Sequence, residues 1–147
     1  MKEEAYQFCK AYILGRLQRI TKNIIEINAS LNSETKSSAG DKHETGRAML
    51  QLEREKLSQQ LLEAEKTAQL LKRVKASKQS NSVILGSLVK TSNATYYIAI
   101  SAGKFEYKSG IVYCISANTP IGKLLLGKVK EMSFVFNNKE HKILEVN

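Results

Sequence analysis

The sequence has few of the residues that mark several large classes of protein: two cysteines, one proline and no tryptophan among 147 residues. Cys9 and Cys114 lie in segments that look like different domains, so we expect no disulfide framework. Together with His43 and His141 they show no spacing typical of a zinc site. Disulfide-rich and zinc-dependent folds are therefore not expected.

Long apolar runs are also missing. No stretch approaches the ~20 apolar residues that span a bilayer. The opening MKEEAYQFCK contains acidic residues and no apolar core, so it does not resemble a signal peptide. Neither a nucleophile–base pair nor a phosphate-binding loop is apparent. We expect a cytoplasmic protein that does not bind membranes, has no cofactor of its own and is not a self-contained enzyme.

Charge of one sign is in excess. The 23 Lys and Arg residues outnumber the 14 Asp and Glu residues, which gives a net charge of +9. The excess is spread along the chain instead of forming a basic tail. It favours approach to nucleic acid, or to a polymerase that holds DNA and RNA. A basic surface that only keeps the protein soluble is the alternative.

Two long helices are predicted in the first half of the chain, where no proline interrupts. Residues 3–33 and about 42–76 each carry apolar residues at alternating steps of three and four, typical of a coiled-coil seam, except for one step of seven in the second segment where the polar Arg54 intervenes. The first seam is Ile13, Leu17, Ile20, Ile24, Ile27 and Leu31; the second is Leu50, Leu57, Leu61, Ala64, Ala68 and Leu71. Residues 34–41 between them contain turn formers, which predicts an antiparallel hairpin of helices over residues 1–78.

The second half of the chain, residues 79–147, changes to the pattern of strands. After a polar linker at 76–82, short runs rich in Val, Ile, Tyr and Phe predict strands; these are residues 83–89, 95–101, 111–116, 132–136 and 141–146. Residues 137–140 read as a hairpin turn. Thr119 and Pro120 predict the cap and first position of one short helix that ends at Gly127. The whole chain is thus predicted to be α+β, with a small antiparallel β domain.

The predicted hairpin end carries two carboxylates, Asp41 and Glu44. Their spacing is that of a capping box, in which both side chains bond backbone N–H groups at a helix start. Alternatively, their oxygens could bind a divalent cation such as Mg²⁺ in a site completed by another molecule. The two interpretations are compatible, because a capping carboxylate retains lone pairs.

The layout resembles that of the bacterial Gre transcript-cleavage factors, a coiled-coil hairpin followed by an FKBP-like domain. Two motifs carry the resemblance: Gly40-Asp41-x-x-Glu44, and the block from Ile115 to Gly127, ISANTPIGKLLLG. The closing residues 140–146 are similar to the last strand of that family. The resemblance covers nearly the whole chain.

The resemblance implies a transcription elongation factor that acts, as a monomer, on RNA polymerase. The hairpin would enter the secondary channel, where Asp41 and Glu44 help to hold Mg²⁺ shared with the polymerase during cleavage of backtracked RNA. Asn118, Thr119 and Pro120 would dock on the channel rim. Arg16, Arg19 and Lys22 would face the 3′ end of the nascent RNA.

Two other functions stay open. Lys42, His43 and Arg47 surround the acidic pair, and cations compete with a metal for carboxylates; a channel binder that modulates polymerase without cleavage is therefore the main alternative. A prolyl isomerase or chaperone is the other, since the second domain resembles FKBP. That activity needs an aromatic-lined apolar pocket, and the aromatic residues of this region are more readily explained as strand residues.

Overall fold

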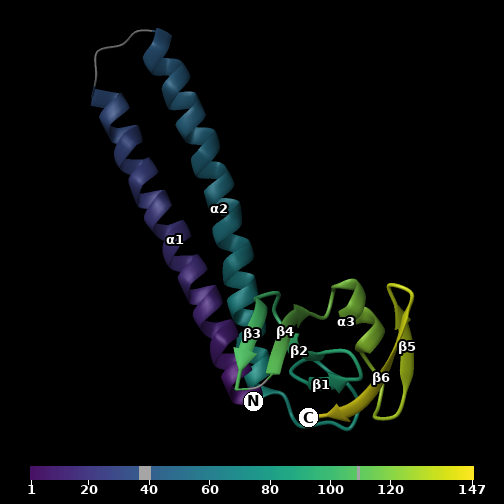
Figure 1. Cartoon of the computed structure of the whole chain (residues 1–147). Coiled ribbons are helices and arrows are strands. Elements are labelled where there is room, and N and C mark those ends of the chain that lie inside the picture. The colour runs from purple at the N-terminus through teal and green to yellow at the C-terminus, as the bar shows by residue number, and fades with distance from the viewer. Residues whose placement is uncertain (37–40, 109) are drawn as a thin grey trace. The chain divides into compact units, whose positions relative to one another are not determined.

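The computed structural model describes residues 1–36, 41–108 and 110–147, with the side chains of all of these except 34–36, 41–43 and 76. Two long helices, α1 (Lys2–Lys36) and α2 (Asp41–Ala76), precede a six-stranded sheet and a short helix, α3 (Pro120–Leu125) (Figure 1). The fold is α+β, as predicted. In these described ranges, no helix is long and apolar enough to cross a bilayer.

Two compact units divide the chain. One is Ile13–Lys66, which holds most of α1 and α2. The other combines Met1–Tyr12 with Thr67–Asn147, so the first turns of α1 and the last turns of α2 group with the sheet. The domain boundary predicted between residues 78 and 79 was placed where the apolar pattern changes from that of helices to that of strands. It stays a prediction.

In the helical unit, the predicted apolar stripes are the covered faces of the helices. Ile13, Ile20 and Ile27 are buried at seven-residue intervals on α1, and Leu57 and Ala64 continue the pattern on α2. Ile27 and Leu31 form one apolar cluster with Leu57, flanked by Ile24 and Leu50. Each helix therefore covers part of the other's stripe, which neither could bury alone.

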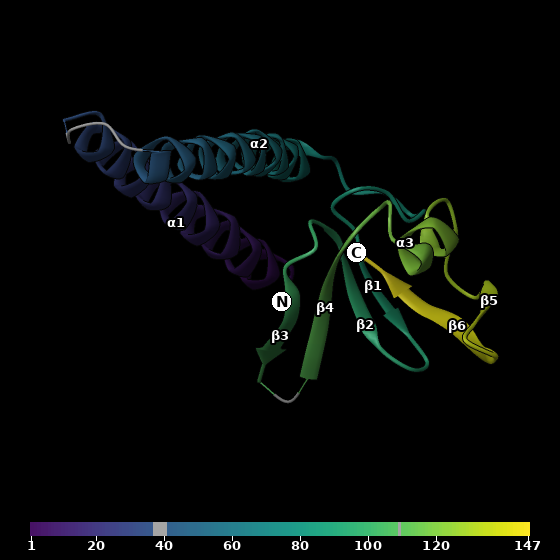
Figure 2. The same ribbon diagram turned by 90° about the horizontal axis from the view of Figure 1, so that it is seen from above.

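The sheet has six strands in the order β3-β4-β2-β1-β6-β5 (Figure 2). The strands are β1 (Leu88–Thr91), β2 (Thr95–Ala99), β3 (Gly103–Tyr107), β4 (Gly110–Ser116), β5 (Ser133–Phe136) and β6 (Lys139–Val146). Four neighbouring pairs are antiparallel, but β2 and β4 are parallel. The sheet is therefore mixed, and the prediction of a purely antiparallel domain was wrong.

Strand β3 explains this error. The segment Gly103–Tyr107 was not among the predicted strands; it contains Lys104 and Glu106, which form an exposed ion pair of 2.8 Å. It is an edge strand, where charged side chains are common. Because β3 carries the chain back outside β4, β4 can lie parallel to β2.

The strand predicted at 83–89 was also wrong over most of its length. The chain turns at Leu85 and Gly86, and β1 begins only at Leu88. Gly86 has a φ of +92°, and a Cβ there would lie 2.5 Å from the Ser77 hydroxyl oxygen. The close approach of the chain to the end of α2 requires a glycine, which ends the extended run. The other predicted strands are present, and the two-residue turn Asn137-Asn138 joins β5 and β6 with both residues at positive φ.

Both faces of the sheet are covered. On one face, Val89, Ile98 and Ile143 form a core with Ile121 and Leu125 from α3. The opposite face carries the row Leu88, Tyr97 and Cys114, which are paired across β1, β2 and β4. The first turns of α1 pack here: the Phe8 and Phe105 rings are 5.1 Å apart, and the Tyr107 hydroxyl donates to the Glu4 carboxylate at 3.2 Å. This compact unit thus consists of a sheet between two apolar layers.

The core of the sheet yields a stability prediction. Ile143 is fully buried, whereas its neighbour Leu144 is 39% exposed on the other face of β6. We expect Ile143→Ala to lower the free energy of unfolding by about 3 kcal/mol, through lost apolar burial and a cavity. Leu144→Ala, the matched control, should cost less than about 1 kcal/mol. Urea unfolding followed by circular dichroism measures both; equal losses would show that the core is not centred on Ile143.

Candidate functional site

The start of α2 carries the two predicted acidic residues. Asp41 is the first residue of α2, but its side chain lies outside the described residues, as do residues 37–40. The predicted turn at Gly40, the capping box and the arrangement of the acidic pair thus lie outside them too. Glu44 is described and exposed in the first turn, and Arg47 is exposed three residues later.

An exposed carboxylate at this place has a defined chemistry. The Glu44 side chain projects from the N-terminal turn of a long helix, where the helix dipole favours negative charge. Its oxygens are hard ligands that suit Mg²⁺ when other ligands are supplied by a partner. Within the described part of the chain, no three His, Cys, Asp or Glu side chains are grouped as metal ligands.

The start of α3 is formed by the predicted docking residues. Thr119 is the helix cap: its hydroxyl accepts a hydrogen bond from the Gly122 N–H at 3.1 Å and donates to the Ser116 carbonyl at 2.7 Å. Pro120 occupies the first helical position, where no N–H is needed. Asn118 and Pro120 are exposed and Thr119 is half-buried. The three residues therefore form a fixed, accessible corner.

Gly122 holds this corner together. A Cβ at this position would lie 2.4 Å from the Ser116 carbonyl oxygen and 2.8 Å from the Thr119 hydroxyl oxygen. Since the carbonyl belongs to the backbone, it cannot rotate away. The glycine in the motif thus lets α3 begin tightly against the end of β4.

The predicted basic residues lie on α1 in the helical unit. Arg16, Arg19 and Lys22 are all exposed. The ammonium nitrogen of Lys22 lies 4.0 Å from a carboxylate oxygen of Glu26. Arg16 also lines a groove of about 380 Å³ to which α2 contributes Lys56 and Gln60. This contribution of α2 was not predicted, because no local motif marks residues that meet only through helix packing.

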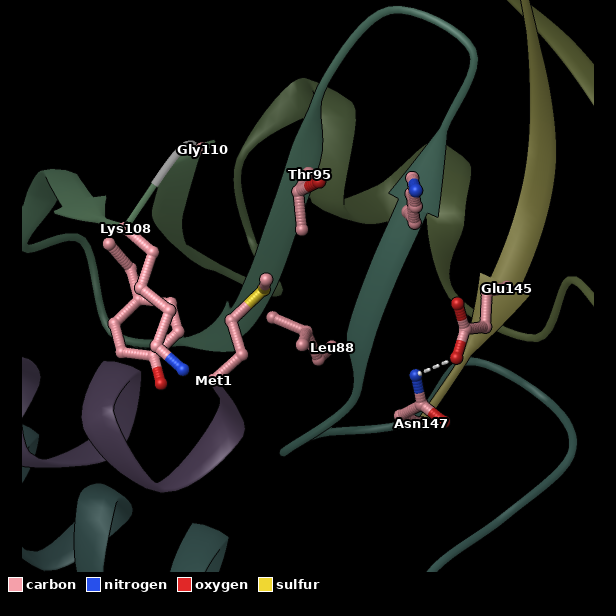
Figure 3. Close-up of a pocket in the computed structure, with 9 residues that line it drawn as sticks. Met1, Leu88, Thr95, Lys108, Gly110, Glu145 and Asn147 are labelled. Atoms are coloured by element: carbon pink, nitrogen blue, oxygen red, sulfur yellow. Dashed lines mark hydrogen bonds between the residues drawn. The ribbon is translucent and has the colours of Figure 1, made fainter.

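A second cavity, of about 570 Å³, lies on the sheet (Figure 3). Leu88 and Met1 provide apolar walls, and Lys90, Lys108 and Glu145 provide charges. The Asn147 side chain donates to the Glu145 carboxylate at 2.7 Å. These residues come from segments far apart in the sequence, so no local motif predicted the cavity.

The aromatic residues of the sheet do not gather in that cavity. Tyr107 is the one aromatic side chain among the described residues that line it. Tyr97 and Phe134 are buried in the sheet packing, and the rings of Tyr96 and Tyr113 lie tilted against one another with centres 6.0 Å apart. The arrangement gives no particular support to the alternative of a prolyl isomerase.

Comparison of the chain with models of known protein families, and with curated proteins, gives no match.

The cap of α3 can be tested directly. Thr119→Ala removes both hydroxyl hydrogen bonds, so the free energy of unfolding should fall by about 1 kcal/mol. Thr119→Ser keeps an oxygen that can accept from Gly122 and should lose less than half of that amount. Chemical denaturation compares the two variants with the unsubstituted protein. Equal destabilisation by Ala and Ser would indicate that the threonine methyl group, instead of the cap, supports the corner.

Proposed function

We propose that this protein is a Gre-type elongation factor, which binds RNA polymerase through its sheet domain and inserts a helical hairpin into the secondary channel. The observation that carries the proposal is the pair of helices: α1 and α2 have 35 and 36 residues. At about 1.5 Å per residue, each is roughly 50 Å long. Such a pair has the reach to place a few side chains deep inside a narrow channel.

An antiparallel coiled-coil hairpin is the arrangement that best fits these helices. Only residues 37–40 separate α1 from α2, and the apolar cluster joins Ile27 and Leu31 to Leu57. Buried positions at seven-residue spacing are typical of coiled-coil packing. The hairpin end would then carry Asp41 and Glu44.

The corner at the start of α3 is the proposed docking site for the channel rim. Asn118 and Pro120 are exposed, and the Thr119 cap and Gly122 fix the local backbone. A rigid loop loses little conformational entropy on binding, which favours its use as an interface. In this proposal the FKBP-like domain binds the polymerase, and it needs no isomerase activity to do so.

At the polymerase active site, the proposed role of Asp41 and Glu44 is to supply carboxylate oxygens to a loosely held Mg²⁺. Held there by the two carboxylates together with polymerase ligands, such an ion would supply a water activated for hydrolysis of the RNA phosphodiester. Glu44 has the required exposure. Arg16, Arg19 and Lys22 would face the RNA, where their charges attract phosphates.

A second function, channel binding without cleavage, is favoured by one observation. Arg47 is exposed one helical turn after Glu44, at a spacing that places both side chains on the same side of α2. A guanidinium close to a carboxylate competes with a metal ion for the same oxygens. The hairpin would then act by occupying the channel.

Conservative substitutions at the hairpin end separate the two functions. Asp41→Asn and Glu44→Gln keep the shape of each side chain but remove the negative charge that Mg²⁺ requires. In a cleavage assay on stalled, backtracked complexes made with polymerase of the same organism, we expect each variant to lose at least about tenfold in rate, the effect of about 1.4 kcal/mol. Polymerase binding and thermal stability should hardly change, because Asn caps a helix about as well as Asp.

Arg47→Gln is the matched control, since it removes a charge at the same end of α2 and should leave cleavage unchanged or faster. Absence of cleavage by the unsubstituted protein, together with inhibition that survives both acid substitutions, would support the non-cleaving channel binder. Parallel loss of stability and of every activity would mean that the acidic residues only hold the helix start.

A further inference from the structure

The cavity on the sheet has no part in the function proposed above (Figure 3). Its volume of about 570 Å³ falls within the range of about 300–1,000 Å³ that is typical of sites for small molecules. All the described residues that line it belong to the compact unit of Met1–Tyr12 and Thr67–Asn147, so its shape is set within one unit. The chemistry of its walls therefore indicates what it can bind.

Three neighbouring strands, β2, β1 and β6, form much of the cavity. Leu88 and Lys90 are two residues apart on β1, so their side chains project from the same face of the sheet. Thr95 of β2 and Glu145 of β6 lie opposite Lys90 on either side. Asn147 and Leu88 exchange two backbone hydrogen bonds, of 2.8 and 2.9 Å. These walls are thus fixed by backbone pairing before any ligand binds.

Two ammonium groups at the cavity have no anionic partner. Lys90 lies opposite Glu145, but it is the Asn147 amide that binds the Glu145 carboxylate, at 2.7 Å. The ion pairs of the described residues include neither Lys90 nor Lys108. The Lys108 ammonium lies 5.1 Å from the centre of the Tyr107 ring. With two ammonium groups against one carboxylate, the side chains of the cavity favour an anion.

Apolar side chains form the rest of the cavity. Leu88 is 7% exposed and Met1 is 49% exposed, and both line it. Tyr107 adds an aromatic surface, and its ring is held in place because its hydroxyl donates to the Glu4 carboxylate at 3.2 Å. The flexible thioether of Met1 can adapt to the shape of a ligand. An organic anion can bury its apolar part here, whereas an inorganic anion would leave these walls in contact with water.

We propose that this cavity binds a small organic anion, whose acidic group is attracted by Lys90 and Lys108 and whose apolar body packs against Leu88 and Met1. The Glu145 carboxylate, oriented by Asn147, accepts a hydrogen bond from a hydroxyl or amino group of a ligand that has one. Nucleotides and aliphatic carboxylates share the required chemistry of an acidic head and an apolar body. The site is separate from the hairpin end and from the α3 corner, and it does not depend on the function proposed above.

Titration of the isotope-labelled full-length protein with AMP and, separately, with octanoate tests the proposal by NMR. We expect one of these two anions to bind with a Kd below about 1 mM. It should shift the backbone amide signals of Leu88, Lys90 and Gly110, which line the cavity, more than those of β5, which forms the far edge of the sheet. Tighter binding of AMP would identify the ligand as a nucleotide, and tighter binding of octanoate would identify it as an aliphatic carboxylate.

Fragments of the two probes show whether both parts of the cavity are used. Adenosine lacks the acidic group, whereas inorganic phosphate and acetate lack the apolar body. Each fragment should bind at least about tenfold more weakly than the anion from which it derives, because it makes only part of the contacts.

Removal of both cavity charges is the informative substitution. The double variant Lys90→Gln/Lys108→Gln should bind the anion at least about tenfold more weakly. Its midpoint of thermal unfolding should hardly change, because neither lysine takes part in an ion pair of the described residues. The matched control is Lys123→Gln/Lys139→Gln, which removes the same charge from exposed positions outside the cavity and should lose less than about twofold.

Four results would each overturn the proposal: no binding of either anion, fragments that bind as tightly as the whole anions, amide shifts away from the cavity, or an equal loss of affinity in the control variant. The titrations use the unsubstituted protein, so they decide the matter even if a variant folds poorly.

Discussion

The helical part of the molecule depends on one constraint: each of two long helices must cover an apolar stripe that it cannot bury alone. Ile27 and Leu31 of α1 meet this requirement together with Leu57 of α2. The stripes are narrow, and polar and charged side chains such as Arg16, Lys22 and Glu26 are exposed on the rest of α1. A narrow seam and a polar exterior suit the arm that we propose to enter a channel lined by protein and nucleic acid.

The sheet meets a different constraint, because both of its faces need cover. Residues of α3 supply it on the side of Val89 and Ile98, and the first turns of α1 supply it on the side of Tyr97 and Cys114. As a result, the start of α1 is part of the same compact unit as the sheet.

Sequence pattern predicted the elements whose signals are local. The long helices follow from seven-residue spacing, and α3 follows from Thr119, Pro120 and Gly127 within one short block. Features that depend on contacts between distant residues were not predicted. Strand β3 was missed because its exposed face carries charged residues instead of an apolar pattern. The turn at Gly86 was missed because it depends on the close approach of the chain to Ser77. For the candidate site, the α3 corner was predicted in detail. The contribution of Lys56 to the groove beside Arg16 required the packed structure.

The central claim, that the hairpin end enters the polymerase channel, is tested most directly by site-specific photo-crosslinking. A photoreactive amino acid would replace Ala48, which is exposed one turn after Glu44, and in separate proteins Asn118 or the exposed Lys130 as a control. With polymerase of the same organism, we predict that position 48 crosslinks to the catalytic subunits beside the active centre and that position 118 crosslinks to the channel rim. Crosslinks from position 118 with none from position 48, or none to polymerase from either, would contradict the account.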